Sequence, residues 1–169
     1  MKTQQAMKLN IRPPSLNDGA AIARLVNQSK TLDVNSTYLY FLLADHFADT
    51  CAVAEFGDEV VGFVTAYRLP SQPNVLFVWQ IAISATMQGK GLASALLESF
   101  EQRDWFAKIK AVQCTISPSN KASNALFAKW ARHLGAQVHI KPYLTSQHLG
   151  LGHEAEPLVE LDMSALTTH

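Results

Sequence analysis

Apolar residues recur at helical spacing in the first part of the chain and predict two helices. Ile22, Leu25 and Val26 fall on one helix face, after a polar residue, Asn17 or Asp18, that can cap a helix. A later run is apolar on nearly all sides, as expected for a short buried helix. The elements expected here are an edge strand over Leu9–Arg12, a helix after Asp18, a polar break over Thr31–Thr37 and a buried helix over Tyr38–Phe47.

A period of two replaces the helical spacing in the middle of the chain and predicts strands. Gly57, Asp58 and Glu59 separate two runs rich in β-branched residues, which indicates a hairpin. Pro70 and Pro73 mark a loop before a third alternating run. The expected strands are Cys51–Glu55, Val60–Arg68 and Val75–Ile83.

Strands and helices alternate in the last part of the chain. Gly89 and Gly91 precede a helix with Leu92, Leu96 and Phe100 on one side. The further elements expected are a strand over Ala111–Ile116, a helix that begins at Asn120 or Ser119 and ends at Gly135, strands over Val138–Ile140 and Leu158–Met163, and a loop over Thr145–Pro157. We therefore expect an α/β (α+β) protein with a mixed sheet and helices on both faces. We expect one domain over residues 9–166, after a flexible arm over residues 1–8.

The composition excludes several classes of partner. The 169 residues are 48% apolar and 17% charged, which suits a buried core and not a disordered chain. Lys and Arg total 14, as do Asp and Glu, and without a basic run we expect no nucleic-acid partner. No apolar run approaches the ~20 residues of a membrane span and no signal peptide opens the chain, so we expect a cytoplasmic protein without a membrane partner. Cys51 and Cys114 lack metal-ligand spacing, and we expect buried thiols and no metal.

The segment Gln88–Ala93, with the sequence Gln-Gly-Lys-Gly-Leu-Ala, lies between a predicted strand and a predicted helix. Its two glycines let the backbone turn tightly, and unpaired amides at the start of a helix favour a pyrophosphate. A Rossmann-type dinucleotide site is excluded because the third glycine is missing. A Walker loop is excluded because no Gly-Lys-Ser/Thr is present. The motif alone fits a flexible turn without a ligand equally well.

Two further segments of the chain favour a ligand-binding role for the same loop. Together with Trp79–Ile83 and the segment Asn120–Phe127, it resembles the GCN5-related N-acetyltransferase superfamily. The resemblance implies a mostly antiparallel mixed sheet, acetyl-CoA as donor and direct attack of an amine on the thioester. It also implies that a backbone amide, at Ile81, holds the negative charge that develops on the carbonyl oxygen. The residues expected to contact acetyl-CoA are Trp79, Ile81, Ala82, Ile83, Gln88, Gly89, Lys90, Gly91, Leu92, Ala93, Asn120, Ser123 and Phe127.

Phe127 departs from the superfamily pattern. Members often have a Tyr at this position, whose hydroxyl protonates the leaving thiolate, and Phe has no proton to give. Water, the product ammonium, Tyr38 or His153 then remain as the proton donor.

Longer sequence segments indicate which amine accepts the acetyl group. Residues 32–36, 38–47, 51–54, 61–64, 77–80 and 153–158 resemble the diaminobutyrate acetyltransferase family, over nearly the whole chain. This resemblance implies transfer of acetyl to the 4-amino group of L-2,4-diaminobutyrate, a step of ectoine synthesis, by a cytoplasmic homodimer.

A diamino acid carries two ammonium groups and one carboxylate, so its site needs acidic partners. The residues alone favour a turn role for Asp33, and the resemblance makes it a substrate ligand. Glu156 is either a solvated loop charge or a carboxylate that binds the ammonium or accepts its proton. His153 is either a surface residue or one that orients Glu156 or relays a proton.

Each of three aromatic residues fits either a packing role or a contact with the substrate. Trp79 either packs in the core or places its ring beside an ammonium, an attraction of ~0.5–2 kcal/mol. Tyr38 and Tyr40 either pack or donate hydrogen bonds to the substrate. The candidate catalytic residues are therefore Glu156, Asp33, His153 and Tyr38, and the candidate substrate-binding residues are Asp33, Trp79, Tyr38 and Glu156.

Two alternatives remain open. The first is another enzyme of the same superfamily that acts on a polyamine, on ornithine, on an antibiotic or on a protein lysine. The second is a non-catalytic domain that senses acetyl-CoA, which Phe127 in place of Tyr favours.

Overall fold

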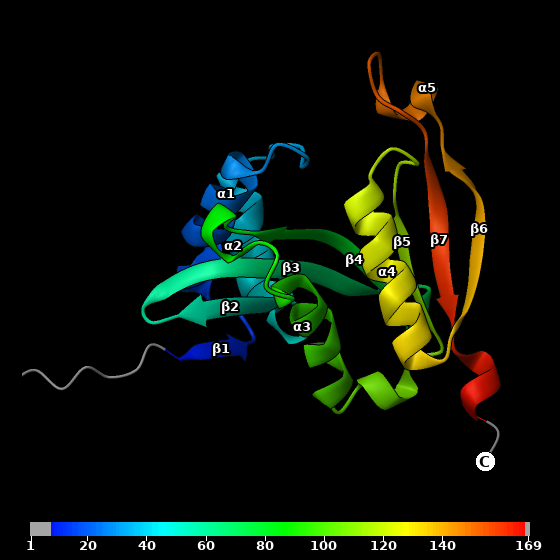
Figure 1. The fold of residues 1–169 in the computed structure, drawn as a ribbon, viewed down its shortest axis with the longest axis horizontal. Helices are drawn as coiled ribbons and strands as arrows, with labels where there is room; N and C mark the ends of the chain where they lie inside the picture. Colours follow the sequence, from blue (N-terminus) through cyan, green and yellow to red (C-terminus); the bar gives the residue numbers. More distant parts are fainter. Residues whose placement is uncertain (1–7, 168–169) are drawn as a thin grey trace, which may run out of the picture. The chain divides into compact units, whose positions relative to one another are not determined.

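Seven strands form one mixed sheet in the order β1-β2-β3-β4-β5-β7-β6 in the computed structural model, which describes residues 8–167 (Figure 1). The chain divides into two compact units. The first holds the residues up to Thr65 together with Gln80–Phe100, and the second holds Ala66–Trp79 together with the residues from Glu101 onward. The prediction of one domain over residues 9–166 stays a prediction. The flexible arm predicted for residues 1–8 lies, except for Lys8, outside the described residues.

The first unit contains three neighbouring antiparallel strands, of which the second and third form the hairpin predicted at Gly57–Glu59. β1 (Leu9–Arg12) pairs with β2 (Ala52–Phe56), which pairs with β3 (Glu59–Leu69), and a bulge lies between Ala54 and Glu55. The helices of this unit are α1 (Gly19–Gln28), α2 (Thr37–His46) and α3 (Leu92–Glu98), with 3-10 turns at Leu16–Asp18, Ala48–Thr50 and Ala85–Met87. A further 3-10 turn, Ser99–Gln102, begins in this unit and ends in the second.

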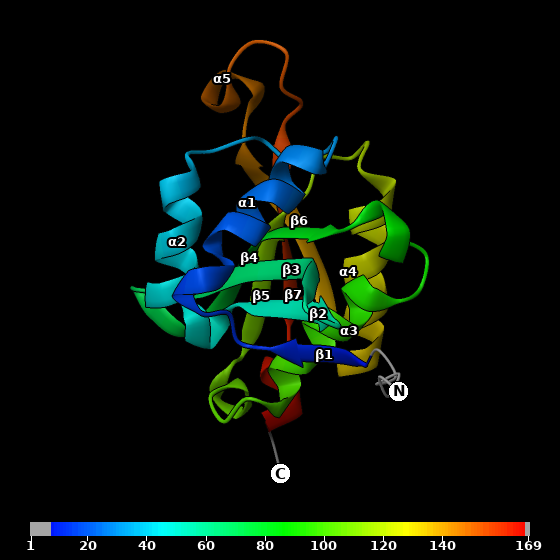
Figure 2. The ribbon, with the colours of Figure 1, turned by 90° about the vertical axis from the view of Figure 1, so that its left-hand side faces the viewer.

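Helices cover both faces of the β2–β3 pair in the first unit. α1 and α2 lie side by side (Figure 2), and their apolar side chains share one core with Val53 and Phe63. Gly62 points to the opposite face, where a Cβ would lie 2.8 Å from Cδ1 of Ile83 and 3.4 Å from Cδ1 of Leu96 in α3. The expected arrangement of helices on both faces is thus confirmed for this unit.

The second unit contains the parallel pair of the sheet. β4 (Gln72–Ile83) pairs in parallel with β5 (Ala111–Thr115), and β7 (Glu156–Asp162) pairs antiparallel with β5 and with β6 (Gln137–Leu144). The helices are α4 (Lys121–Leu134), which runs beside β5 in Figure 1, and the short α5 (Ser146–Leu149), with 3-10 turns at Phe106–Lys108 and Ser164–Thr167. No helix in residues 8–167 has the length and apolar character needed to cross a bilayer.

Several predicted boundaries are wrong for identifiable reasons. Pro73 lies inside β4, because proline is tolerated near the first residue of a strand. Pro142 lies inside β6, an edge strand with a register shift between Lys141 and Leu144, where a missing backbone donor costs little. The helix predicted through Phe100 ends as α-helix at Glu98 and continues as a 3-10 turn. The predicted loop 145–157 contains α5 and overlaps the first two residues of β7, which begins at Glu156.

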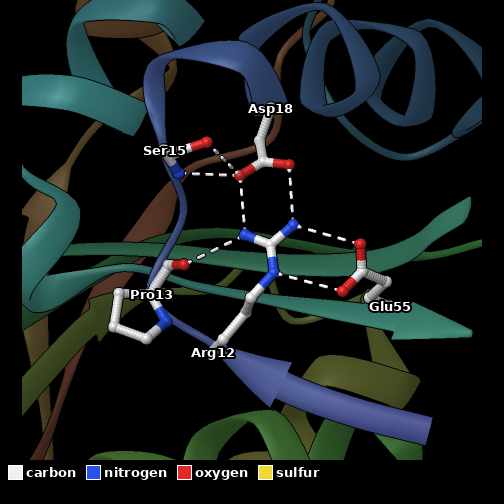
Figure 3. A network of polar contacts seen from close by, with 5 residues as sticks. All are labelled: Arg12, Pro13, Ser15, Asp18 and Glu55. Carbon is white, nitrogen blue, oxygen red and sulfur yellow. Dashed lines mark hydrogen bonds and ion pairs between the residues drawn. The ribbon is translucent and has the colours of Figure 1, made fainter. Parts of the chain in front are cut away.

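Asp18 occupies the predicted capping position of α1, but its side chain has another role (Figure 3). Its carboxylate accepts hydrogen bonds from Nη1 and Nη2 of Arg12, at 2.8 and 3.1 Å, and from the amide and hydroxyl of Ser15. Arg12 also contacts Glu55 on β2. Burial acts to raise the pKa of Asp18, but the hydrogen bonds from Arg12 and Ser15 outweigh it and lower that pKa below its usual value.

Candidate active site

The glycine loop lies between the 3-10 turn after β4 and the start of α3. Gly89 and Gly91 have φ angles of 74° and 76°, in the left-handed region that favours glycine. A Cβ at either position would meet no atom within 4 Å, so backbone conformation and not crowding requires these glycines. The side chain of Gln88 donates from Nε2 to the carbonyl of Ile83 at 3.3 Å and so ties the loop to the end of β4.

This loop is suited to an anionic ligand. Residues 88–91 are exposed, whereas Leu92, the first residue of α3, is buried and anchors the loop to the core. The open space over Gly89 and Gly91 leaves room for an anion beside the backbone amides, and the cation of Lys90 lies in the same loop. The two glycines therefore have the left-handed conformation that a tight turn requires, and binding of a pyrophosphate at this loop stays a prediction.

A network of polar side chains, of which Tyr40 and Gln80 are buried and Asn35 is half-buried, contacts the backbone of Asp33 in the first unit. The hydroxyl of Tyr40 donates to Oε1 of Gln80 at 3.1 Å, and Nδ2 of Asn35 donates to the Tyr40 oxygen at 3.4 Å. Nε2 of Gln80 donates to the backbone carbonyl of Asp33 at 3.4 Å, and Asn35 contacts the same carbonyl at 3.3 Å. The backbone of the Asp33 segment is thus held to β4 and α2, while the Asp33 side chain is exposed.

Thr65 on β3 belongs to the same hydrogen-bond network. Its hydroxyl accepts a hydrogen bond from the amide of Gln80 at 3.2 Å and donates one to the Gln80 carbonyl at 3.3 Å. A side chain therefore satisfies both backbone groups of Gln80 at the start of the segment Ile81–Ile83, whose side chains are half-buried. The buried Tyr40 has a structural hydroxyl, whereas Tyr38 is 71% exposed.

The second unit positions the segment that begins α4. Oδ1 of Asn120 accepts a hydrogen bond from the amide of Ser123 at 3.1 Å, so Asn120 is the N-cap of α4 as predicted. Phe127 is 4% exposed, and its ring packs edge-on against Trp130 at 6.3 Å between centroids. Phe127 is thus a buried packing residue, and it has no hydroxyl that could donate a proton.

Glu156 begins β7 and is oriented by a residue that sequence reasoning missed. Its Oε2 accepts a hydrogen bond of 2.7 Å from the hydroxyl of Thr115 on β5. The neighbouring Glu154 accepts one from Ser119. Within residues 8–167 no hydrogen bond or ion pair joins His153 to Glu156, and His153 is exposed. Thr115 therefore makes the orienting contact with Glu156 that was one of the two interpretations of His153.

The remaining candidates of the second unit are an aromatic ring and a thiol. Trp79 is 39% exposed, so its ring is available to a ligand and is not a buried core residue. Cys114 is buried, and burial raises the pKa of its thiol well above the usual range. The predicted burial of Cys51 is also confirmed. No cluster of His, Cys, Asp and Glu in the described chain has the geometry of a metal site.

The comparisons with known proteins agree with this geometry. The acetyltransferase (GNAT) family model matches residues 20–131. The L-2,4-diaminobutyric acid acetyltransferase of Halalkalibacterium halodurans is 44% identical over 149 residues, which are 88% of this chain and 78% of that protein. The enzyme of the same name from Bordetella parapertussis is 41% identical over 158 residues, which are 92% of this chain and 85% of that protein. The chain belongs to the L-2,4-diaminobutyric acid acetyltransferase family of GNAT enzymes.

A solved structure extends the family relationship to three dimensions. Diaminobutyrate acetyltransferase EctA from Paenibacillus lautus, in complex with L-2,4-diaminobutyric acid and coenzyme A, is 33% identical and has a TM-score of 0.89. The match covers 94% of this chain and 96% of the EctA chain. The GNAT fold expected from the sequence is therefore confirmed, and this member of the diaminobutyrate acetyltransferase family is an acyltransferase with acetyl-CoA as donor.

The predicted site residues divide between the two units of this diaminobutyrate acetyltransferase family member. The first unit holds Asp33, Tyr38, Ile81–Ile83 and the glycine loop, and the second holds Trp79, Asn120, Ser123, Phe127, His153 and Glu156. Sequence reasoning missed four residues that position these groups: Asn35, Thr65, Gln80 and Thr115. Only the polar character of Thr65 and Gln80, each between apolar neighbours in its strand, signals a buried hydrogen bond.

Proposed function

We propose that this protein transfers the acetyl group of acetyl-CoA to the 4-amino group of L-2,4-diaminobutyrate, giving N4-acetyl-L-2,4-diaminobutyrate and coenzyme A. The observation that carries the proposal is the match, at 33% identity and a TM-score of 0.89, to a structure solved with this diamino acid and coenzyme A. The exposed carboxylate of Asp33 and the carboxylate of Glu156, which Thr115 holds, have the charge that a substrate with two ammonium groups needs.

The reaction needs a neutral amine and a place for negative charge. The 4-ammonium group has a pKa near ~10 in solution, so it must lose a proton before attack. Its lone pair then forms the C–N bond at the thioester carbonyl carbon, the C–S bond breaks, and the thiolate takes up a proton. We assign the backbone amide of Ile81 to the developing oxyanion, a contact worth roughly 3–4 kcal/mol in other enzymes.

The carboxylates bind and orient the diamine in this proposal. Asp33 binds the ammonium that does not react, and the hydrogen bonds of Gln80 and Asn35 to its backbone hold it for that role. Glu156 binds the 4-ammonium and accepts its proton, directly or through water. The exposed face of Trp79 adds a cation–π contact to the bound ammonium.

The proton for the leaving thiolate comes from a group other than residue 127, because Phe127 has no acidic proton. Tyr38 and His153 are the candidates on this chain, and both side chains are exposed. The buried hydroxyl of Tyr40 already donates to Gln80 and is not assigned this role.

Binding of acetyl-CoA is assigned to the segments predicted from the sequence. The loop Gln88–Ala93 binds the pyrophosphate through its amides and through Lys90. Ile81–Ile83 and Trp79 on β4, with Asn120, Ser123 and Phe127 on α4, flank the pantetheine arm. The positive φ angles of Gly89 and Gly91 and the open space above them support this assignment.

We also propose that the protein is a cytoplasmic homodimer. The edge strand β6 supports a protein partner, because Val138, Ile140 and Tyr143 expose apolar surface along it. The cytoplasm is the compartment that supplies acetyl-CoA. Light scattering after size-exclusion chromatography tests the dimer, and a mass of one chain, 18.6 kDa, would contradict it.

A thiol-release assay tests the activity against both alternatives. Acetyl-CoA is offered with diaminobutyrate, ornithine, spermidine or a lysine peptide, and free thiol is measured. We expect release with diaminobutyrate at a kcat/KM well above that of every other amine. Preference for another amine would assign the enzyme to that substrate, and no release with any amine would indicate a domain that only binds acetyl-CoA.

A further inference from the structure

Two carboxylates just before and at the start of β7 contact the end of β5 and the residues that follow it. The hydroxyl of Thr115 donates to Oε2 of Glu156 at 2.7 Å, and that of Ser119 donates to Glu154. The backbone contributes a further contact, from the amide of Ile116 to the carbonyl of Pro157 at 3.4 Å. Side chains and backbone thus both attach this segment to the connection between β5 and α4.

The two oxygens of Glu156 differ in their surroundings. The backbone of Glu156 pairs with Leu144 on β6, whereas its half-buried side chain reaches Thr115 on β5. Oε2 accepts the Thr115 hydrogen bond, and Oε1 has no hydrogen-bond partner within residues 8–167. The carboxylate is therefore held at one oxygen and open at the other.

We propose that Thr115 is a positioning residue, which fixes the Glu156 carboxylate so that Oε1 faces the substrate ammonium. This inference rests on the proposed function, in which Glu156 binds that ammonium. Thr115 itself touches neither substrate nor acetyl-CoA in this account.

The physical basis is the cost of ordering a flexible side chain. A glutamate side chain has three rotatable bonds, and fixing them upon substrate binding would weaken that binding. Thr115 fixes them on folding instead, through a hydrogen bond to a charged acceptor, which is stronger than one between neutral groups. The β-branched side chain of Thr115 is itself stiff at χ1, so the direction of its hydroxyl is well defined.

The same two strands offer a matched control. Nε2 of Gln113, two positions before Thr115 on β5, donates to Oε2 of Glu160 on β7. Both hydrogen bonds join β5 to a carboxylate of β7, but Glu160 has no assigned role with the substrate. Gln113→Leu therefore removes a comparable cross-strand bond without touching the proposed site.

The test compares the KM for diaminobutyrate with the KM for acetyl-CoA in Thr115→Val, Thr115→Ser and Gln113→Leu. We expect Thr115→Val to raise the KM for diaminobutyrate about fivefold to tenfold and to change the KM for acetyl-CoA less than about twofold. Thr115→Ser keeps the hydroxyl and is expected to stay within about twofold of wild type for both. Gln113→Leu is expected to change neither KM. If Thr115→Val does not fold, Thr115→Ala removes the same hydroxyl and is read in the same way.

Glu156→Gln separates this inference from the proposed function. If Thr115 acts through Glu156, adding Thr115→Val to Glu156→Gln causes no further loss of kcat/KM. A Glu156→Gln enzyme with the wild-type kcat/KM would overturn the role of Glu156. An impaired Glu156→Gln, combined with a Thr115→Val that behaves like Gln113→Leu, would overturn the positioning role of Thr115 alone.

Discussion

The buried hydroxyl of Tyr40 donates a hydrogen bond to Oε1 of Gln80 at 3.1 Å and so joins α2 to β4. The other end of the same amide, Nε2 of Gln80, holds the carbonyl of Asp33. One buried side chain therefore connects the helix, the strand and the loop that presents a candidate substrate ligand.

Replacing Tyr40 with Phe removes this hydrogen bond and leaves a buried amide oxygen without its donor. We expect a loss of about 1–3 kcal/mol in the free energy of unfolding, measured with urea, together with a higher KM for diaminobutyrate. Tyr38→Phe is the control for stability, because Tyr38 is exposed and its hydroxyl supports no buried group. Equal stability of the Tyr40→Phe and Tyr38→Phe proteins would contradict this account.

Asp33→Asn tests the carboxylate that is proposed to bind the ammonium that does not react. Because the amide keeps the shape and loses the charge, we expect the KM for diaminobutyrate to rise about tenfold or more, with little change in stability. Asp58→Asn, in the exposed turn between β2 and β3, is the matched control and should behave as wild type in steady-state kinetics. A similar, small effect of both substitutions would remove Asp33 from the site.

Gly91→Ala tests the conformation of the glycine loop. The left-handed backbone disfavours alanine by roughly 1–2 kcal/mol, and a shifted loop should raise the KM for acetyl-CoA. Gly135→Ala, at the end of α4, is the matched control because its φ of 67° imposes the same strain away from the loop. We expect both variants to lose stability and only Gly91→Ala to bind acetyl-CoA more weakly in calorimetry. Unchanged acetyl-CoA affinity in Gly91→Ala would argue against the pyrophosphate role.

Asp18→Asn tests the network around Arg12. Because folding lowers the pKa of Asp18, its contribution to stability is present above the unfolded pKa of ~3.9 and is lost as pH falls through the lower folded value. We expect the variant to be less stable than wild type at pH 7, by about 1–3 kcal/mol, and the difference to shrink below about pH 4. Glu59→Gln breaks only the exposed contact with Arg24 and should change stability little. If the difference in the free energy of unfolding between wild type and Asp18→Asn did not change with pH, the stabilising role of the ionised Asp18 carboxylate would be excluded.

Much of the fold follows from local pattern. The spacing of Ile22, Leu25 and Val26 predicts α1, and alternation predicts β2, β3 and most of β4, because burial of one face imposes the period of each element. The ends of elements are less predictable. Pro73 suggests a loop, yet it lies within β4, just as Pro142 lies within β6, since tolerance of proline depends on whether a neighbouring strand needs its donor.

Some residues of the candidate site can likewise be predicted from the sequence, and others cannot. Compact motifs such as Gln88–Ala93 and Asn120 can be recognised from sequence, because their function depends on neighbouring residues. The contacts of Thr115 with Glu156 and of Gln80 with Tyr40 join residues about 40 positions apart. No local pattern encodes such a pair, so the positioning residues emerge only from the folded structure.

The central claim is acetyl transfer to the 4-amino group of diaminobutyrate, and the position of the acetyl group in the product tests it most directly. The purified protein is incubated with acetyl-CoA and L-2,4-diaminobutyrate labelled with ¹⁵N at the 4-amino group, and the product is analysed by NMR. We predict a new amide N–H signal coupled to the labelled nitrogen, in an amount equal to the thiol released. An acetylated product without that coupling, or the absence of an acetylated product, would contradict the account.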